Sequence, residues 1–429
     1  MSRNQKIEVP PQLALMAQEL AVALVAKHVG FDVDEFDVEW HFDSHKSRAL
    51  SFVSGIRFLT SDSSEQRRAY IEKRIAVLCA RAYATMLVLL RNAKADGSPI
   101  SGDEFWTSLH DIGDRSLVLE LCAAYLIEDA NKSYSGGQEE EEFVGRQNEY
   151  IRCHGIRTVA AVLTETEFLS FVDKLLSNSE LSTGMFRTTI SAEVLQGYTP
   201  GISTVQIGEG DCPAVMLSHP SPDLTLTRRA RSEEDAGLSR RCLVAHEIGH
   251  WLAAQYVEIP TSGVTFNLKE LSGSCCVFLG PCAFQWSLER YLSARIAVLC
   301  AGSYADCWLG YPDERVAIGD VFFRTLYSGT GRDDFAKLRE LLPLYRTTQH
   351  SLDMHHDLKY PQRRDEILSV LNALLKKFEL YGALRSPKFA ELVEVMLCRA
   401  QSSSNAQVEF HTAELDAACS EHRLCGGDQ

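Results

Sequence analysis

Apolar residues recur every three to four positions along much of the chain, which is the spacing of a buried helix face. This pattern predicts helices over residues 13–29, 65–91, 240–257, 288–309, 334–342 and 365–381. Shorter β-rich runs follow two of these helices and predict antiparallel strand pairs, at 36–42 with 50–53 and at 264–268 with 275–279. The expected fold class is therefore α+β, predominantly α-helical.

The chain contains an internal repeat. The heptapeptide RIAVLCA occurs at residues 74–80 and again at 295–301. Residues 15–29 also match residues 243–257, and two further matches follow in the same order. Two unrelated amphipathic helices would account for one match but not for four colinear ones, so a duplication is the better interpretation.

The repeat sets the predicted domain organisation. We expect two homologous domains in tandem, each with a small β element. The predicted boundaries are 1–178 for the first copy, 179–235 for a linker with some strand structure, 236–400 for the second copy and 401–429 for a polar tail.

Composition narrows the classes of partner. Lys and Arg number 43 against 58 Asp and Glu, which gives a net charge of −15 among 429 residues and disfavours nucleic acid as a partner. The longest apolar run, 75–90, is interrupted by Arg81 and is too short to cross a bilayer, so no membrane association is expected. The 13 cysteines are scattered without a CxxC motif, which predicts a reducing, cytoplasmic location.

One motif carries recognisable chemistry. Residues 246–250 read HEIGH, an HExxH sequence within a predicted helix. Positions i and i+4 share one helix face, so His246 and His250 can bind the same metal ion. Glu247 would then lie beside the metal and could serve as a general base. The expected cofactor is Zn²⁺.

The second copy resembles the peptidase domain of FtsH-type AAA+ zinc proteases. HEIGH stands where that family has HEAGH, a following helix begins with Arg-Ile-Ala at residue 295, and residues 328–335 read SGTGRDDF against the family's TGASNDL. The resemblance implies a zincin-like fold and a third zinc ligand at Asp334, with Asp333 as the alternative. Glu289, on the following helix, is a weaker alternative of the kind found in glutamate-type zincins.

Two departures from that family shape the functional prediction. The chain has no GxxxxGK[ST] motif, so we expect no ATP-driven unfolding. In the first copy, Gln18 and Val22 replace the two histidines, and only Glu19 is retained from the motif. The first copy is therefore predicted to be a degenerate pseudo-peptidase.

The leading prediction is an ATP-independent zinc metallopeptidase that hydrolyses flexible or unfolded polypeptides. The strand that carries Val264 and Phe266 is expected to offer an edge for an extended substrate. A polypeptide substrate is the expected partner, together with a homo-oligomer or a separate unfoldase. The alternative is a non-catalytic scaffold or regulator with a structural or gated zinc site.

Overall fold

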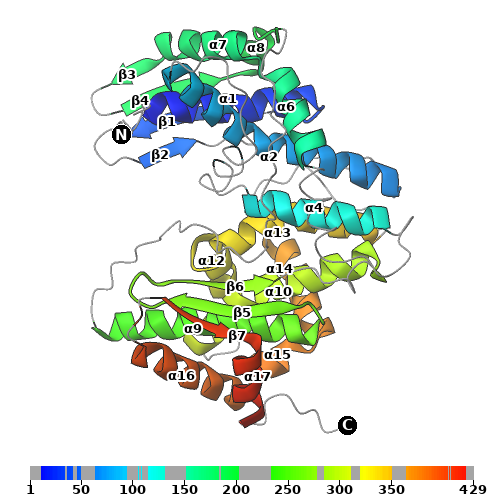
Figure 1. The fold of residues 1–429 in the computed structure, drawn as a ribbon, viewed down its shortest axis with the longest axis vertical. Helices are drawn as coiled ribbons and strands as arrows, with labels where there is room; N and C mark the ends of the chain where they lie inside the picture. The colour runs from blue at the N-terminus through cyan, green and yellow to red at the C-terminus, as the bar shows by residue number, and fades with distance from the viewer. Residues whose placement is uncertain are drawn as a thin grey trace, which may run out of the picture. The chain divides into compact units, whose positions relative to one another are not determined.

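The computed structural model describes most of the chain. The described residues are 11–33, 36–41, 46–49, 63–93, 105, 108, 115–130, 151–182, 185–201, 233–277, 285–310, 319–349, 364–403, 405 and 407–421. These residues are mainly helical, with two small antiparallel sheets (Figure 1). The chain divides into two compact units: Met1–Tyr125, Glu141–Ala214 and Leu352–Asp357 form the first, and Leu126–Glu140, Val215–Ser351 and Leu358–Gln429 form the second.

The first unit packs helices against a four-stranded sheet of order β2-β1-β4-β3. Helix α1 contacts strands β1 and β2 on one side and helices α2, α6 and α7 elsewhere. The elements of the first unit are α1 (Pro11–His28), β1 (Phe36–His41), β2 (Lys46–Ala49), α2 (Ser64–Ala93), the π-helix η1 (Ile151–Ile156), α6 (Arg157–Val162), α7 (Glu165–Ser177), β3 (Glu180–Ser182), β4 (Met185–Ile190) and α8 (Ala192–Gln196). Helix α4 (Arg115–Ala130) runs across the division between the units.

The second unit has a three-stranded sheet of order β6-β5-β7, and helix α9 packs on strands β5 and β6 (Figure 1). Its elements are α9 (Glu233–Tyr256), β5 (Thr261–Asn267), β6 (Ser272–Val277), α10 (Leu288–Gly310), α12 (Asp320–Ser328), α13 (Arg332–Thr348), α14 (Arg364–Lys377), α15 (Leu380–Leu384), α16 (Pro387–Ser402), β7 (Gln407–His411) and α17 (Thr412–Glu421).

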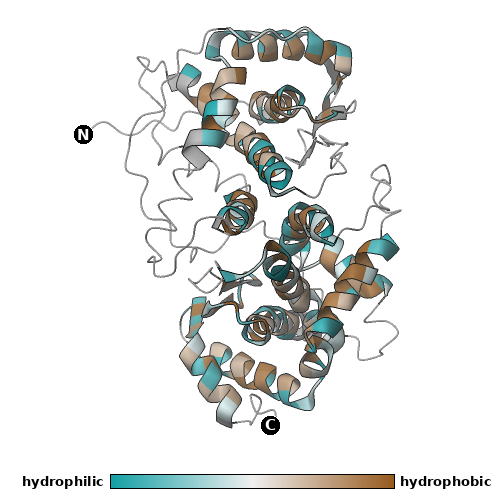
Figure 2. Cartoon of the chain, turned by 90° about the vertical axis from the view of Figure 1, so that its right-hand side faces the viewer, coloured by the Kyte–Doolittle hydropathy of each residue, from teal (hydrophilic) through white to brown (hydrophobic). Residues whose placement is uncertain are grey.

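Helix α10 is the centre of the second unit. Between Tyr291 and Cys307 every residue but Arg295 is buried, so the helix packs on nearly all sides rather than along one stripe. Helices α9, α12, α13, α14 and α15 all contact it. The surrounding helices carry apolar and polar residues together, as the colouring in Figure 2 shows. None of the described helices combines the length and apolar character that crossing a membrane requires.

The helices predicted from periodicity are present, and β5 pairs with β6 close to the predicted positions. In the first unit β1 pairs with β2, which lies at residues 46–49 and not at the predicted 50–53; residues 50–53 lie outside the described residues. One predicted helix, 365–381, is divided in two. Glu379 adopts a left-handed conformation with φ of 56°, which ends α14 and starts α15. A left-handed residue cannot continue a right-handed helix, so the break has a local backbone cause.

The predicted linker and the predicted polar tail both contribute ordered elements. Strand β4 pairs with β1 along its whole length, and β7 pairs with β5 in the same antiparallel sense. Each segment therefore completes the sheet of its own unit and ends in a short helix, α8 or α17. Residues 202–232, in the rest of the predicted linker, lie outside the described residues.

The sequence holds a weak signal for this extension. Ser191-Ala192-Glu193 and Thr412-Ala413-Glu414 are separated by the same interval as the two RIAVLCA segments. Ser191 caps the N-terminus of α8, and Thr412 is the first residue of α17. Both units begin with a helix, a strand pair and a long helix, and both end with a strand and a short helix; the first unit has the additional strand β3 before β4.

The pairing of β5 with β7 leaves no room for a side chain at Gly263. This residue has φ of 141°, and a Cβ atom there would lie 2.0 Å from the carbonyl oxygen of Phe410. We expect Gly263→Ala to lower the free energy of unfolding by about 2 kcal/mol, because the backbones must separate. Denaturant titration would measure the change.

Gly382 provides the matched control, since a Cβ at that position meets no atom within 4 Å. Gly382→Ala lies inside α15 and should be neutral or slightly stabilising, because Ala favours helix over Gly. Equal stability of the two variants would contradict the tight β5–β7 pairing.

Candidate metal centre

Helix α9 places both histidines of the HExxH motif on its buried face. His246 is 4% exposed and His250 is 6% exposed. The apolar residues around them, including Val244, Ile248 and Trp251, are fully buried and fix the helix against its neighbours. The spacing of four residues brings the two imidazole rings to a centroid distance of 4.6 Å.

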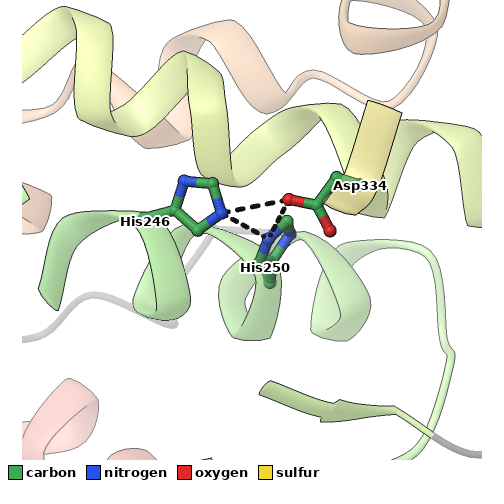
Figure 3. Close-up of side chains that lie close together, drawn as sticks. All are labelled: His246, His250 and Asp334. Atoms are coloured by element: carbon green, nitrogen blue, oxygen red, sulfur yellow. Dashed lines mark hydrogen bonds and ion pairs between the residues drawn. The ribbon is translucent and has the colours of Figure 1, made fainter. Parts of the chain in front are cut away.

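Asp334, in the first turn of α13, completes a three-residue group with these histidines (Figure 3). Its Oδ2 atom lies 3.0 Å from His246 Nε2 and 3.1 Å from His250 Nε2, and the two Nε2 atoms are 3.0 Å apart. A tetrahedral zinc ion with bonds of about 2.1 Å separates its ligand atoms by about 3.4 Å. The three atoms therefore need to move apart only slightly to hold zinc, and one coordination position would remain open.

The backbone of α10 fixes the protonation of His250. Its Nδ1 atom lies 2.7 Å from the carbonyl oxygen of Val298. A carbonyl can only accept a hydrogen bond, so Nδ1 carries the proton and donates it. The lone pair is thereby placed on Nε2, the atom that faces His246 and Asp334, as in metal sites oriented by outer hydrogen bonds.

Small residues allow α9 and α10 to approach closely at this point. A Cβ atom at Gly302 would lie 2.5 Å from the Cε1 and Nε2 atoms of His250. A Cβ at Gly249 would lie 2.8 Å from the Cβ of Ala305. The His250 ring therefore fills the space that a side chain at position 302 would take.

The loop before α13 is attached to α10, and this attachment positions Asp334. The hydroxyl of Thr330 donates to Asp306 Oδ2 at 2.5 Å. Gly331 packs so closely on Ser303 that a Cβ there would overlap the hydroxyl oxygen. Asp334 follows three residues later and points back to the histidines of α9.

The other two candidates for a third ligand lie elsewhere. Asp333 precedes Asp334 in α13 but is exposed. Glu289 is also exposed, and its Oε1 atom accepts a hydrogen bond from Gln349 at 2.7 Å. Of the three acidic residues considered from the sequence, the structure brings only Asp334 to the histidines.

The electrostatics of the group favour a charged carboxylate. Burial raises the pKa of Asp334, but the adjacent His250 and His246 outweigh burial and hold that pKa well below its usual value. Burial lowers the pKa of His246, yet the hydrogen bond and charge of Asp334 raise it to about 9. A buried anion between two imidazoles is the donor set that a divalent cation such as zinc would stabilise.

Glu247 lies on the same helix and is 6% exposed. Burial raises its pKa above the ordinary value for glutamate. Strand β6 passes directly over it, because a Cβ atom at Gly273 would lie 2.8 Å from Glu247 Cγ. The carboxylate is thus held between α9 and the sheet, beside the metal-ligand group.

The prediction that the strand of Val264 and Phe266 offers a free edge is wrong. Strand β5 is the central strand of its sheet, hydrogen-bonded to β6 on one side and to β7 on the other. Val264 is 1% exposed and Phe266 is fully buried, with its ring 6.0 Å from that of Phe410. Pairing with the C-terminal β7 was not foreseen from the sequence, and it occupies the expected edge.

Several residues that support this centre were not identified as such from the sequence. Gly302, Val298 and Asp306 all belong to α10 and act on the histidines or on the loop before α13. Gly302 directly follows the second RIAVLCA, where the first copy has Arg81, and this difference was a usable signal.

Comparison with known proteins gave no match among protein-family models, among curated proteins or among solved structures.

Gly302→Ala tests whether the close approach of α10 is needed for metal binding. The added methyl group should displace the His250 ring and weaken zinc affinity by at least about tenfold. Zinc content after dialysis against graded chelator would measure this. Gly310→Ala on the same helix is the control, because its Cβ would lie at an ordinary 3.7 Å from Cys242 Sγ. Unchanged zinc retention in both variants would contradict the proposed geometry.

Proposed function

We propose that this protein is a zinc metallopeptidase that cleaves flexible or unfolded polypeptides without using ATP. The observation that carries the proposal is that the Nε2 atoms of His246 and His250 and the Oδ2 atom of Asp334 lie 3.0–3.1 Å from one another. The buried Glu247 lies beside them. In this proposal the two units are duplicated zincin-like domains, and only the second holds metal. The resemblance of residues 242–338 to FtsH-type peptidase domains supports the same interpretation.

The residues have distinct roles in this mechanism. His246, His250 and Asp334 would hold the zinc ion, which when bound supplies a Lewis acid for the scissile carbonyl. Glu247 accepts a proton from the attacking water and delivers it to the nitrogen of the leaving amine. The hydrogen bond from His250 to Val298 and the link from Thr330 to Asp306 keep the ligands in place.

We assign substrate docking to β6 in place of β5. Among the described strands, β6 and β7 are the two edges of the β6-β5-β7 sheet, and we choose β6 because its outer side could take an extended peptide next to Glu247. Gly273 places this strand against Glu247, so a peptide added to β6 would run beside the general base. The absence of a P-loop in the sequence fits substrates that already lack structure, and a folded substrate would require a partner unfoldase.

A second candidate function is a scaffold or regulator with a structural metal. The first unit favours this alternative, because it begins with the same helix, strand pair and helix as the second while Gln18 and Val22 occupy the positions of the histidines. Loss of the biological function on Glu247→Gln separates an enzyme from a scaffold, since a scaffold would tolerate the change.

Glu247→Gln is the direct test of the peptidase. We expect zinc content to stay unchanged while turnover of a fluorescently labelled, denatured protein falls by at least about a hundredfold, because the proton acceptor is lost. Glu258→Gln, just beyond α9 and exposed in an ion pair with Arg290, should leave turnover unchanged. Undiminished cleavage by Glu247→Gln would rule out the proposed general base.

Gly273→Ala tests the contact between β6 and Glu247. A methyl group at this position should displace the carboxylate and lower kcat by about ten- to a hundredfold, since catalytic geometry tolerates little misplacement. Zinc content should not change. Ser272→Ala, the neighbouring residue on β6, serves as the control. Full activity in Gly273→Ala would show that Glu247 does not depend on this strand.

A further inference from the structure

The first unit has a charged side chain at the position that corresponds to the metal site of the second. Residue 81 directly follows the first RIAVLCA, as Gly302 directly follows the second. Helices α1 and α2 pack on each other in the first unit as α9 and α10 do in the second. Arg81 on α2 therefore faces the part of α1 that corresponds to the HExxH segment.

Arg81 contacts the one motif residue that the first unit retains. Its Nε atom lies 3.3 Å from Oε1 of Glu19, the counterpart of Glu247. The Glu19 side chain is 7% exposed and that of Arg81 is 29% exposed. No hydrogen-bond partner is found among the described residues for the other carboxylate oxygen, Oε2 of Glu19. Arg81 thus supplies the charge that faces a nearly buried carboxylate.

The residues around Arg81 also differ from their counterparts in the second unit. In the second unit, position 302 must be glycine because the His250 ring fills that space. In the first unit, Val22 stands in the place of the second histidine and Arg81 in the place of the glycine. Gln18, in the place of His246, donates from Nε2 to Thr85 Oγ1 at 3.0 Å. Gln18 and Glu19 on α1 thus each have a polar contact with α2.

We propose that Arg81 is a built-in cation that takes the place of a metal ion in the first unit. Removing one partner of a poorly exposed ion pair leaves an uncompensated charge, which is destabilising. The guanidinium therefore lets α1 keep Glu19 on its packed face without any bound ion. The inference depends on the equivalence of the two units and on the Arg81–Glu19 contact, and not on peptidase activity.

A double-mutant cycle in the full-length protein tests this role. Arg81→Met should increase hydrogen–deuterium exchange of the α1 amides by at least about tenfold, because Glu19 loses its counter-charge. Adding Glu19→Gln should restore most of the protection, since the carboxylate charge is removed as well. Arg81→Lys, which keeps the positive charge, should stay close to the wild type.

The same measurement on α9 separates the two proposals. Chelation should raise exchange in α9 and leave α1 unchanged, whereas Arg81→Met should affect α1 and leave zinc content unchanged. If Arg81→Met leaves α1 protected, or if Glu19→Gln fails to rescue it, the inference about Arg81 is overturned. If only the effect of the chelator on α9 is absent, the zinc proposal fails and the Arg81 inference stands.

Discussion

The close approach of α9 and α10 is the constraint on which the second unit depends. Gly249 and Gly302 remove the side chains that would separate the two helices, and the His250 ring fills part of the space. The close approach of the helices also allows the Val298 carbonyl to accept a hydrogen bond from His250 Nδ1. The packing of the two helices therefore also orients the His250 ring, because the buried helix α10 supplies the carbonyl that accepts its hydrogen bond.

The rest of the site is built outward from that helix pair. Asp306 on α10 holds Thr330, and the loop that follows brings Asp334 over the histidines. On the other side of α9, strand β6 confines Glu247 through the contact at Gly273. The candidate metal ligands and Glu247 are thus fixed by three separate elements, α10, α13 and β6, that meet on α9. The one loop involved is tied to α10 through Thr330 and Asp306, and such fixed geometry suits a reaction that needs preorganised groups.

Much of this site could be predicted from the sequence because its signals are local. The i, i+4 spacing of His246 and His250 and the periodicity of α9 and α10 fall within single helices, and the structure contains all of them. The role of β7 could not be foreseen in this way. Its pairing with β5 joins residues 263–267 to 407–411, and no local pattern specifies such a distant partner. Because the pairing of β7 with β5 is not predicted from the sequence, the expectation that Val264 and Phe266 lie on an edge strand is wrong.

The two units show two ways of accommodating charge between packed helices. A carboxylate near the core is costly unless an opposite charge compensates it. In the second unit, Asp334 lies between two imidazoles in an arrangement suited to a metal ion. In the first unit, Arg81 on α2 faces Glu19 on α1, and in the proposed equivalence of the two units Arg81 corresponds to Gly302. In both units the paired helices therefore place an opposite or titratable group beside the buried carboxylate.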